Sequence, residues 1–78
     1  MASRQQNEAK FMSCEDTPDG GRVYRLDVAG RHGWLARYLK RVDRDERTLR
    51  FWKEIFDEHG RLVETHQKFP IDTGHQRE

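Results

Sequence analysis

The chain has 78 residues, of which 37% are charged and 33% hydrophobic, and its formal net charge is +1. A chain of this length forms one domain at most and buries only about 60% of the surface that its unfolded form exposes, which excludes a large core. Two Trp, two Tyr and four Phe still predict a folded protein rather than a disordered one.

Cysteine content and hydropathy indicate the cellular compartment of the protein. Cys14 is the single cysteine, so an intramolecular disulfide is excluded. No apolar stretch follows Met1 as it would in a signal peptide, and no run approaches the roughly 20 apolar residues of a membrane span. We therefore expect a cytoplasmic protein that has no contact with membranes.

The first part of the chain, residues 1–21, is polar and ends in turn-forming residues. Pro18, Gly20 and Gly21 mark a boundary. We expect this segment to be a flexible N-terminal arm, followed by a single small β domain over residues 22–78.

From residue 22 onward, an Asp is followed four residues later by Arg in three places. The segments are "DVAGR" at 27–31, "DRDER" at 43–47 and "DEHGR" at 57–61, and runs rich in β-branched and aromatic residues separate them. This spacing predicts a mainly β fold, a four-stranded antiparallel meander over about 22–27, 31–43, 47–57 and 61–69.

The turns themselves have a physical explanation. Asp27 and Asp57 are expected to accept hydrogen bonds from the backbone ahead of them, and Gly30 and Gly60 to take the left-handed conformation that closes a short hairpin loop. "DRDER" has no Gly, which leaves the type of the middle loop open.

A helical interpretation competes with the meander. Leu35, Leu39 and Val42 recur at helical spacing within 34–56. The alternative fold is therefore α+β, with a helix in 34–56.

Strand register decides which side chains share a face. The outer turns set Tyr24 opposite Trp34 and Phe56 opposite Leu62. The middle hairpin has two possible registers. The favoured one pairs Asp43 with Glu46 and Tyr38 with Phe51, and the other pairs Asp43 with Arg47 and Lys40 with Arg50.

A basic block lies in the middle of the chain. Between Arg22 and Lys53, ten Lys or Arg residues occur against four acidic ones. In the favoured register one face carries the candidate partner-binding residues Arg25, Arg37, Arg41, Arg50 and Trp52. Such a face suits a protein partner or a homodimer, and alternatively a nucleic acid. Arginine stems that merely cover the sheet, with Arg37 over Trp52, are the simpler explanation.

The sequence contains no group of residues at the spacing typical of a catalytic or cofactor-binding site. Cys14, His66 and His75 do not have the spacing of metal ligands, and no glycine-rich phosphate loop occurs. We expect no catalytic residue, no cofactor and no metal, and therefore a non-enzymatic binding module.

The stretch "FDEHGRLVET" at 56–65 resembles the YD-type repeat of RHS-family proteins, which is built on an aromatic-Asp-x-x-Gly-Arg-Leu core. The resemblance implies a β-hairpin at this place and no site residues. From residue 22 to 75 the chain is also similar in style to short bacterial proteins of uncharacterised families, and this similarity implies no activity.

Overall fold

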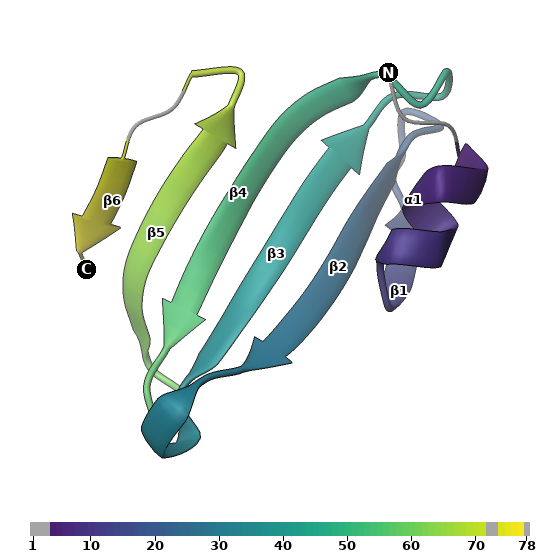
Figure 1. The fold of residues 1–78 in the computed structure, drawn as a ribbon. Coiled ribbons are helices and arrows are strands. Elements are labelled where there is room, and N and C mark those ends of the chain that lie inside the picture. Colours follow the sequence, from purple (N-terminus) through teal and green to yellow (C-terminus); the bar gives the residue numbers. More distant parts are fainter. Residues whose placement is uncertain (1–3, 72–73, 78) are drawn as a thin grey trace.

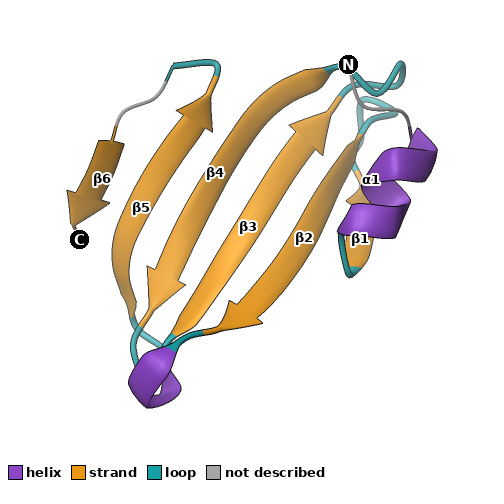
Figure 2. Ribbon diagram, viewed as in Figure 1, coloured by secondary structure: helices purple, strands orange, loops and turns teal. Residues whose placement is uncertain are grey.

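The computed structural model describes residues 4–71 and 74–77. They form one antiparallel sheet, one short α-helix and one 3-10 turn (Figure 1, Figure 2). The elements are α1 (Arg4–Lys10), β1 (Ser13–Asp16), β2 (Arg22–Ala29), η1 (Arg31–Gly33), β3 (Leu35–Val42), β4 (Thr48–Phe56), β5 (Leu62–Phe69) and β6 (Gly74–Arg77).

The strands follow one another across the sheet in chain order, from β1 to β6, and each pair is antiparallel. The predicted mainly β meander is thus confirmed, and β2 to β5 match the four predicted strands. The predicted number of four strands is wrong, because the described sheet has six. The two additional strands, β1 and β6, lie at the two edges (Figure 1).

The alternative with a helix in 34–56 is wrong. This segment holds β3 and β4, which pair along their whole lengths. Strand pairing satisfies the backbone of both segments, and it distributes alternate side chains over two faces, which a helix would not do.

The expectation that residues 1–21 form a flexible arm outside the domain also needs correction. Four residues of this segment, 13–16, pair with β2 as strand β1, and α1 packs beside β2. The reason is tertiary, because a strand as short as β1 and a helix as short as α1 gain stability mainly from the sheet they contact.

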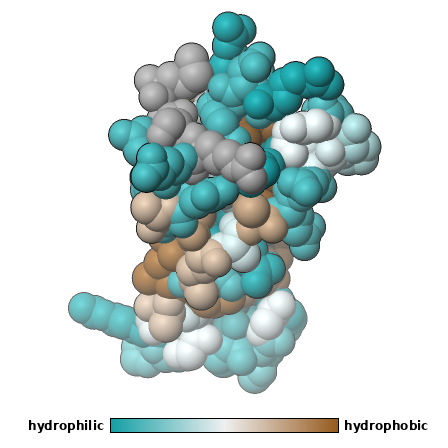
Figure 3. All heavy atoms as spheres, turned by 90° about the vertical axis from the view of Figure 1, so that its right-hand side faces the viewer, coloured by the Kyte–Doolittle hydropathy of each residue, from teal (hydrophilic) through white to brown (hydrophobic). Residues whose placement is uncertain are grey.

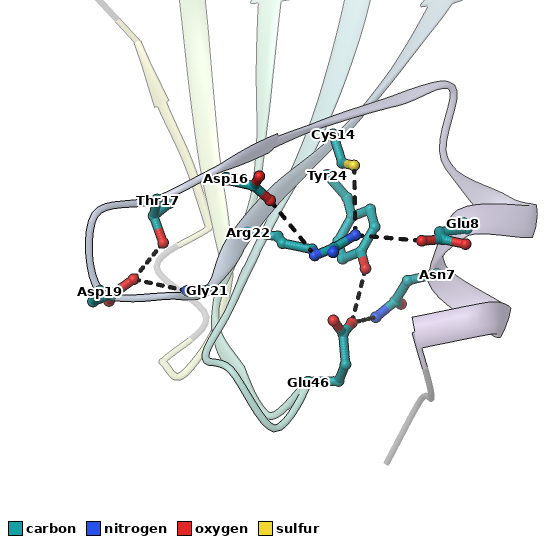
Figure 4. Close-up of polar contacts among 10 residues, drawn as sticks. All are labelled: Asn7, Glu8, Cys14, Asp16, Thr17, Asp19, Gly21, Arg22, Tyr24 and Glu46. Carbon is teal, nitrogen blue, oxygen red and sulfur yellow. Dashed lines mark hydrogen bonds and ion pairs between the residues drawn. The ribbon is translucent and has the colours of Figure 1, made fainter.

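A buried polar network attaches α1 to the sheet. Asn7, which is 1% exposed, donates from Nδ2 to Glu46 Oε2 at 3.0 Å, and the Tyr24 hydroxyl donates to the same oxygen at 2.9 Å. Lys40 Nζ donates to Asn7 Oδ1 at 2.9 Å. Nearby, Arg22 lies 3.3 Å from a carboxylate oxygen of Glu8 on the helix (Figure 4).

The hydrophobic core is small and lies on the side of the sheet that α1 covers, named here the helix face. Its buried members among the described residues are Phe11, Tyr24 and Val42. Tyr38 and Phe51 pack against them and are only partly buried. Seen from the side of α1 and β1, apolar side chains reach the surface around the middle of the molecule (Figure 3). The sheet is therefore largely a single layer, whereas domains are usually built from two.

Three hairpin turns share one five-residue geometry, at 17–21, 43–47 and 57–61. In each, the first N–H donates to the last carbonyl and the fourth N–H donates to the first carbonyl. The fourth residue has a positive φ: +85° at Gly20, +63° at Glu46 and +78° at Gly60. The predicted turn role of Asp57 and Gly60 is thus confirmed, with Asp57 Oδ1 accepting from two backbone N–H groups.

The predicted turn at 27–31 is wrong. Asp27 lies within β2, and Gly30 begins a longer loop in which its N–H donates to the Trp34 carbonyl at 2.7 Å. Asp27 instead uses its carboxylate in ion pairs with arginines. Pro18, Gly20 and Gly21, expected to mark a boundary, lie instead in the hairpin turn "TPDGG" at 17–21, which joins β1 to β2.

The middle hairpin follows neither predicted register throughout. Asp43 lies opposite Arg47 at the turn, and a bulge at the start of β4 then shifts the pairing, so that Lys40 lies opposite Phe51 and Tyr38 opposite Lys53. Relative to the favoured register, the partner of Tyr38 has moved by two residues, which leaves Arg37, Arg50 and Trp52 on their predicted common face.

Of the two residue pairs predicted beside the other turns, one is wrong and one is confirmed. Tyr24 lies opposite Lys40 rather than Trp34, because β2 extends to Ala29, opposite Leu35, and the turn between β2 and β3 therefore lies further along the chain than predicted. Phe56 lies opposite Leu62, as predicted.

Candidate binding face

The five predicted partner-binding residues lie together on the side of the sheet opposite α1, named here the arginine face. Along the strand pairs, Arg25 is opposite Leu39, and Leu39 is opposite Trp52. Arg41 is opposite Arg50 one row away. The structure therefore brings together Arg25, Arg37, Arg41, Arg50 and Trp52 on one face, across β2, β3 and β4.

Arg37 has the most constrained side chain of the five. Its Nε donates to Asp27 Oδ1 at 2.9 Å, and its guanidinium lies 5.0 Å from the ring centroid of Phe56. The hydrogen bond to Asp27 raises the pKa of Arg37 above its usual value, and the charge of Glu54 adds to this effect. Arg25 also approaches Asp27, at 3.6 Å. Asp27 is thus shared by two arginines and offsets one of their two positive charges.

Trp52 is covered by Arg50 rather than by Arg37, which corrects the expected cation–π pair. The Arg50 guanidinium carbon lies 4.2 Å from the Trp52 ring centroid, and Nε donates to Gln67 Oε1 at 2.8 Å. The two-residue shift of register explains the change, because it places Glu54 opposite Arg37 and Leu39 opposite Trp52.

Arg41 and Arg50 carry like charges in directly opposite positions, an arrangement that destabilises a strand pair unless the side chains diverge. They do diverge. Arg41 reaches Asp19 in the first hairpin turn, at 3.5 Å, while Arg50 turns to Trp52. The pKa of Asp19 is lowered by hydrogen bonds from Thr17 and the Gly21 backbone and by the charge of Arg41.

Beside Arg25 and Arg37 lies a hollow of about 170 Å³. The residues that line it are Ser13, Glu15, Val23, Arg25, Arg37, Leu39 and Glu54. Its lining includes guanidinium groups, carboxylates and the apolar side chains of Val23 and Leu39, so the hollow offers hydrogen-bond donors, acceptors and apolar contacts.

The acidic partners of the arginine face were not evident from the sequence. Asp19, Asp27 and Glu54 each lie near one of the arginines. For Asp27, the sequence does contain a signal. Asp27 is two residues from Arg25, so the two side chains share a face if the segment is a strand. Asp19 had no such signal, because its position depends on the pairing of β1 with β2.

The structure separates Cys14 from His66 and His75. His66 and His75 occupy opposite positions in β5 and β6, whereas Cys14 lies on β1 at the other edge of the sheet. Over residues 4–71 and 74–77, no group of three or more His, Cys, Asp or Glu side chains is arranged to hold a metal ion.

Comparisons with known proteins give no further guide to this face. No protein-family model matches the chain, and no curated protein and no solved structure shows significant similarity to it. Within the described part of the chain, no helix has the length and apolar character needed to cross a membrane.

Proposed function

We propose that this chain is a small non-enzymatic binding module that engages a protein partner, or a second copy of itself, through the arginine face. The observation that carries the proposal is the convergence of four arginines and Trp52 on a face that none of the described elements covers. Arginine and tryptophan are the residue types most enriched where binding energy concentrates in protein interfaces.

The charge balance of this face supports a protein partner over a nucleic acid. Arg25, Arg37 and Arg41 each approach a carboxylate of Asp27 or Asp19. A polyanion gains affinity by neutralising cations that lack other partners, whereas a protein surface of mixed charge can exchange ion pairs with this one.

The test is a capture experiment with matched variants. The immobilised chain is compared with Arg41→Glu/Arg50→Glu, which reverses two exposed charges on the arginine face, and with Lys53→Glu/Lys68→Glu, which reverses two on the opposite face. Extracts are treated with nuclease, and bound proteins are identified by mass spectrometry. We expect a protein that is retained by the wild type and the lysine variant and lost with the arginine variant.

Self-association is measured separately, by sedimentation velocity at increasing protein concentration. A partner or dimer that survives Arg41→Glu/Arg50→Glu while both variants keep the wild-type circular dichroism spectrum would show that the arginine face is not the interface.

A further inference from the structure

The helix face carries a second concentration of cations and aromatic rings, distinct from the arginine face. Beyond the end of α1, a hollow of about 270 Å³ is lined by Lys10, Phe11, Leu26, Tyr38, Phe51 and Lys68. Lys53 joins it, because it lies opposite Tyr38 in the strand pair β3–β4. We name Lys10, Lys53, Lys68, Phe11, Tyr38 and Phe51 the lysine–aromatic shelf.

The ammonium groups of the shelf surround the rings. Lys53 Nζ lies 5.9 Å from the ring centroid of Tyr38, and Lys68 Nζ lies 5.3 Å from the same centroid and 5.7 Å from that of Phe51. Lys10 Nζ lies 5.8 Å from the ring centroid of Phe11. Each ring of the shelf therefore has at least one cation beside it.

Within the described part of the chain, these lysines differ from Arg25, Arg37 and Arg41, each of which has an acidic partner. Among the residues that the structure describes, none of Lys10, Lys53 and Lys68 forms an ion pair with a carboxylate. On β5 the closest acid in register is Glu64, opposite Ile55, and it already has an interaction of its own. Positive charge on the shelf is thus available to an external anion.

A fourth lysine, Lys40, lies near enough to Lys10 for their charges to interact. Lys40 lies opposite Phe51 and donates to Asn7, and its pKa is lowered by burial and by the charge of Lys10, while the charge of Glu46 acts in the opposite direction. Glu46, the acid beside it, is already bonded to Asn7 and Tyr24. Lys40 thus adds a fourth cation near the shelf, with the carboxylate of Glu46 beside it.

We propose that the lysine–aromatic shelf binds single-stranded nucleic acid, with bases stacking on Tyr38 and Phe51 and phosphates contacting Lys10, Lys53 and Lys68. Rings flanked by cations provide the two interactions that single strands require, stacking and phosphate neutralisation. The two partly buried rings need bases that are free of a duplex, which favours a single strand over double-stranded DNA. This inference does not depend on the arginine face.

The experiment measures fluorescence anisotropy of a fluorescein-labelled 12-nucleotide oligo(dT) or oligo(U) with the full chain, over a range of salt concentrations. We expect binding that weakens steeply with salt. In Lys53→Gln/Lys68→Gln, which keeps much of each side-chain stem, the slope of log K against log salt should fall by about 0.7 for each lysine removed. Tyr38→Leu should weaken binding by about tenfold, because leucine fills the site without stacking.

The matched control is Arg41→Gln/Arg50→Gln, which removes the same number of charges from the opposite face. We expect its affinity to stay within about twofold of the wild type. Three results would overturn the proposal in folded variants: no binding at low salt, an equal loss in the arginine control, or equal affinity for a labelled poly-glutamate peptide with no effect of Tyr38→Leu. The last would assign the shelf to acidic peptides.

Discussion

Glu46 occupies the left-handed position of the middle turn, where the turns at 17–21 and 57–61 have glycine. Its φ is +63°, a conformation that costs a residue with a side chain about 1 kcal/mol or more. In return, its carboxylate accepts hydrogen bonds from the buried Asn7 and Tyr24. The sequence retains a strained residue here because the side chain connects the turn to α1 and β2.

A glycine at this position separates the two effects. In Glu46→Gly the backbone strain disappears, but two buried donors lose an ionised acceptor, and hydrogen bonds to charged groups contribute about 1.5 to 3 kcal/mol each. We expect a net loss of at least about 1 kcal/mol in the free energy of unfolding, measured with urea. Glu46→Gln, which keeps an acceptor oxygen, should lose less. A glycine variant more stable than the wild type would contradict the role assigned to the network.

Tyr24 provides a pH-dependent signature of the same network. Burial, together with the hydrogen bond to Glu46 and its charge, raises the pKa of Tyr24 from 10.0 to about 12. The neutral phenol is therefore favoured in the folded state. Its contribution to stability is fully present below about pH 10, and it is lost as the pH rises toward 12.

Comparison of Tyr24→Phe with the wild type isolates this contribution, because the lysines titrate in both proteins. At neutral pH the variant should be less stable by about 1 kcal/mol. Between about pH 10 and 12 the difference should shrink, as measured by urea unfolding at each pH. A difference that stays constant over this range would show that the hydroxyl ionises equally easily in both states.

At the scale of elements, α1 acts as a cover over one end of the helix face. Phe11, the residue that follows α1, is 6% exposed, and its ring centroid lies 5.7 Å from that of Tyr24. Among the described hydrophobic residues, Phe11, Tyr24 and Val42 form the buried core cluster. Phe11 is the member of this cluster that comes from the N-terminal segment, so its side chain connects that segment to the core.

Phe11→Ala should therefore destabilise the protein by about 3 kcal/mol, the cost of emptying an aromatic site in a core. Met12→Ala, at the adjacent position that is 68% exposed, is the control and should cost far less. Thermal unfolding followed by circular dichroism distinguishes them. Equal, small effects of both substitutions would mean that residues 4–12 do not contribute to the fold.

At the scale of the whole molecule, the sheet has one layer and two partly open faces. Apolar side chains also remain exposed at the loop end of the helix face, where Val28 is 45% and Trp34 40% exposed. A hollow of about 380 Å³ lies beside Trp34, lined also by Ala36 and Ile55. A domain with this little buried surface gains stability from any partner that binds the folded state.

If the partner of the arginine face is a second copy, stability must depend on protein concentration. We expect the midpoint of thermal unfolding to rise by about 3 °C or more for a tenfold increase in concentration. In Trp52→Ala this dependence should disappear. A midpoint that is independent of concentration would exclude a homodimer as the source of stability and leave a different protein as the partner.

Parts of this architecture could be predicted because they are local. The alternation of residues over 22–69 predicts strands, and the Asp57–Gly60 turn follows from the conformational freedom of glycine and the reach of a short carboxylate. The common face of Arg25, Arg37, Arg41, Arg50 and Trp52 was also predicted, although several expected strand pairs were wrong. Alternation has a period of two, so a register error of an even number of residues does not move a side chain to the other face.

The strand type, the hairpin at 57–61 and the separation of side chains over two faces follow from the local sequence, because they depend on contacts between near neighbours. The places of α1, β1 and β6, the left-handed conformation of Glu46 and the pairing of acids with arginines are seen only in the folded chain. These features depend on pairings between distant segments. Asp27 became a partner of Arg37, rather than a turn residue, only once β2 extended to Ala29.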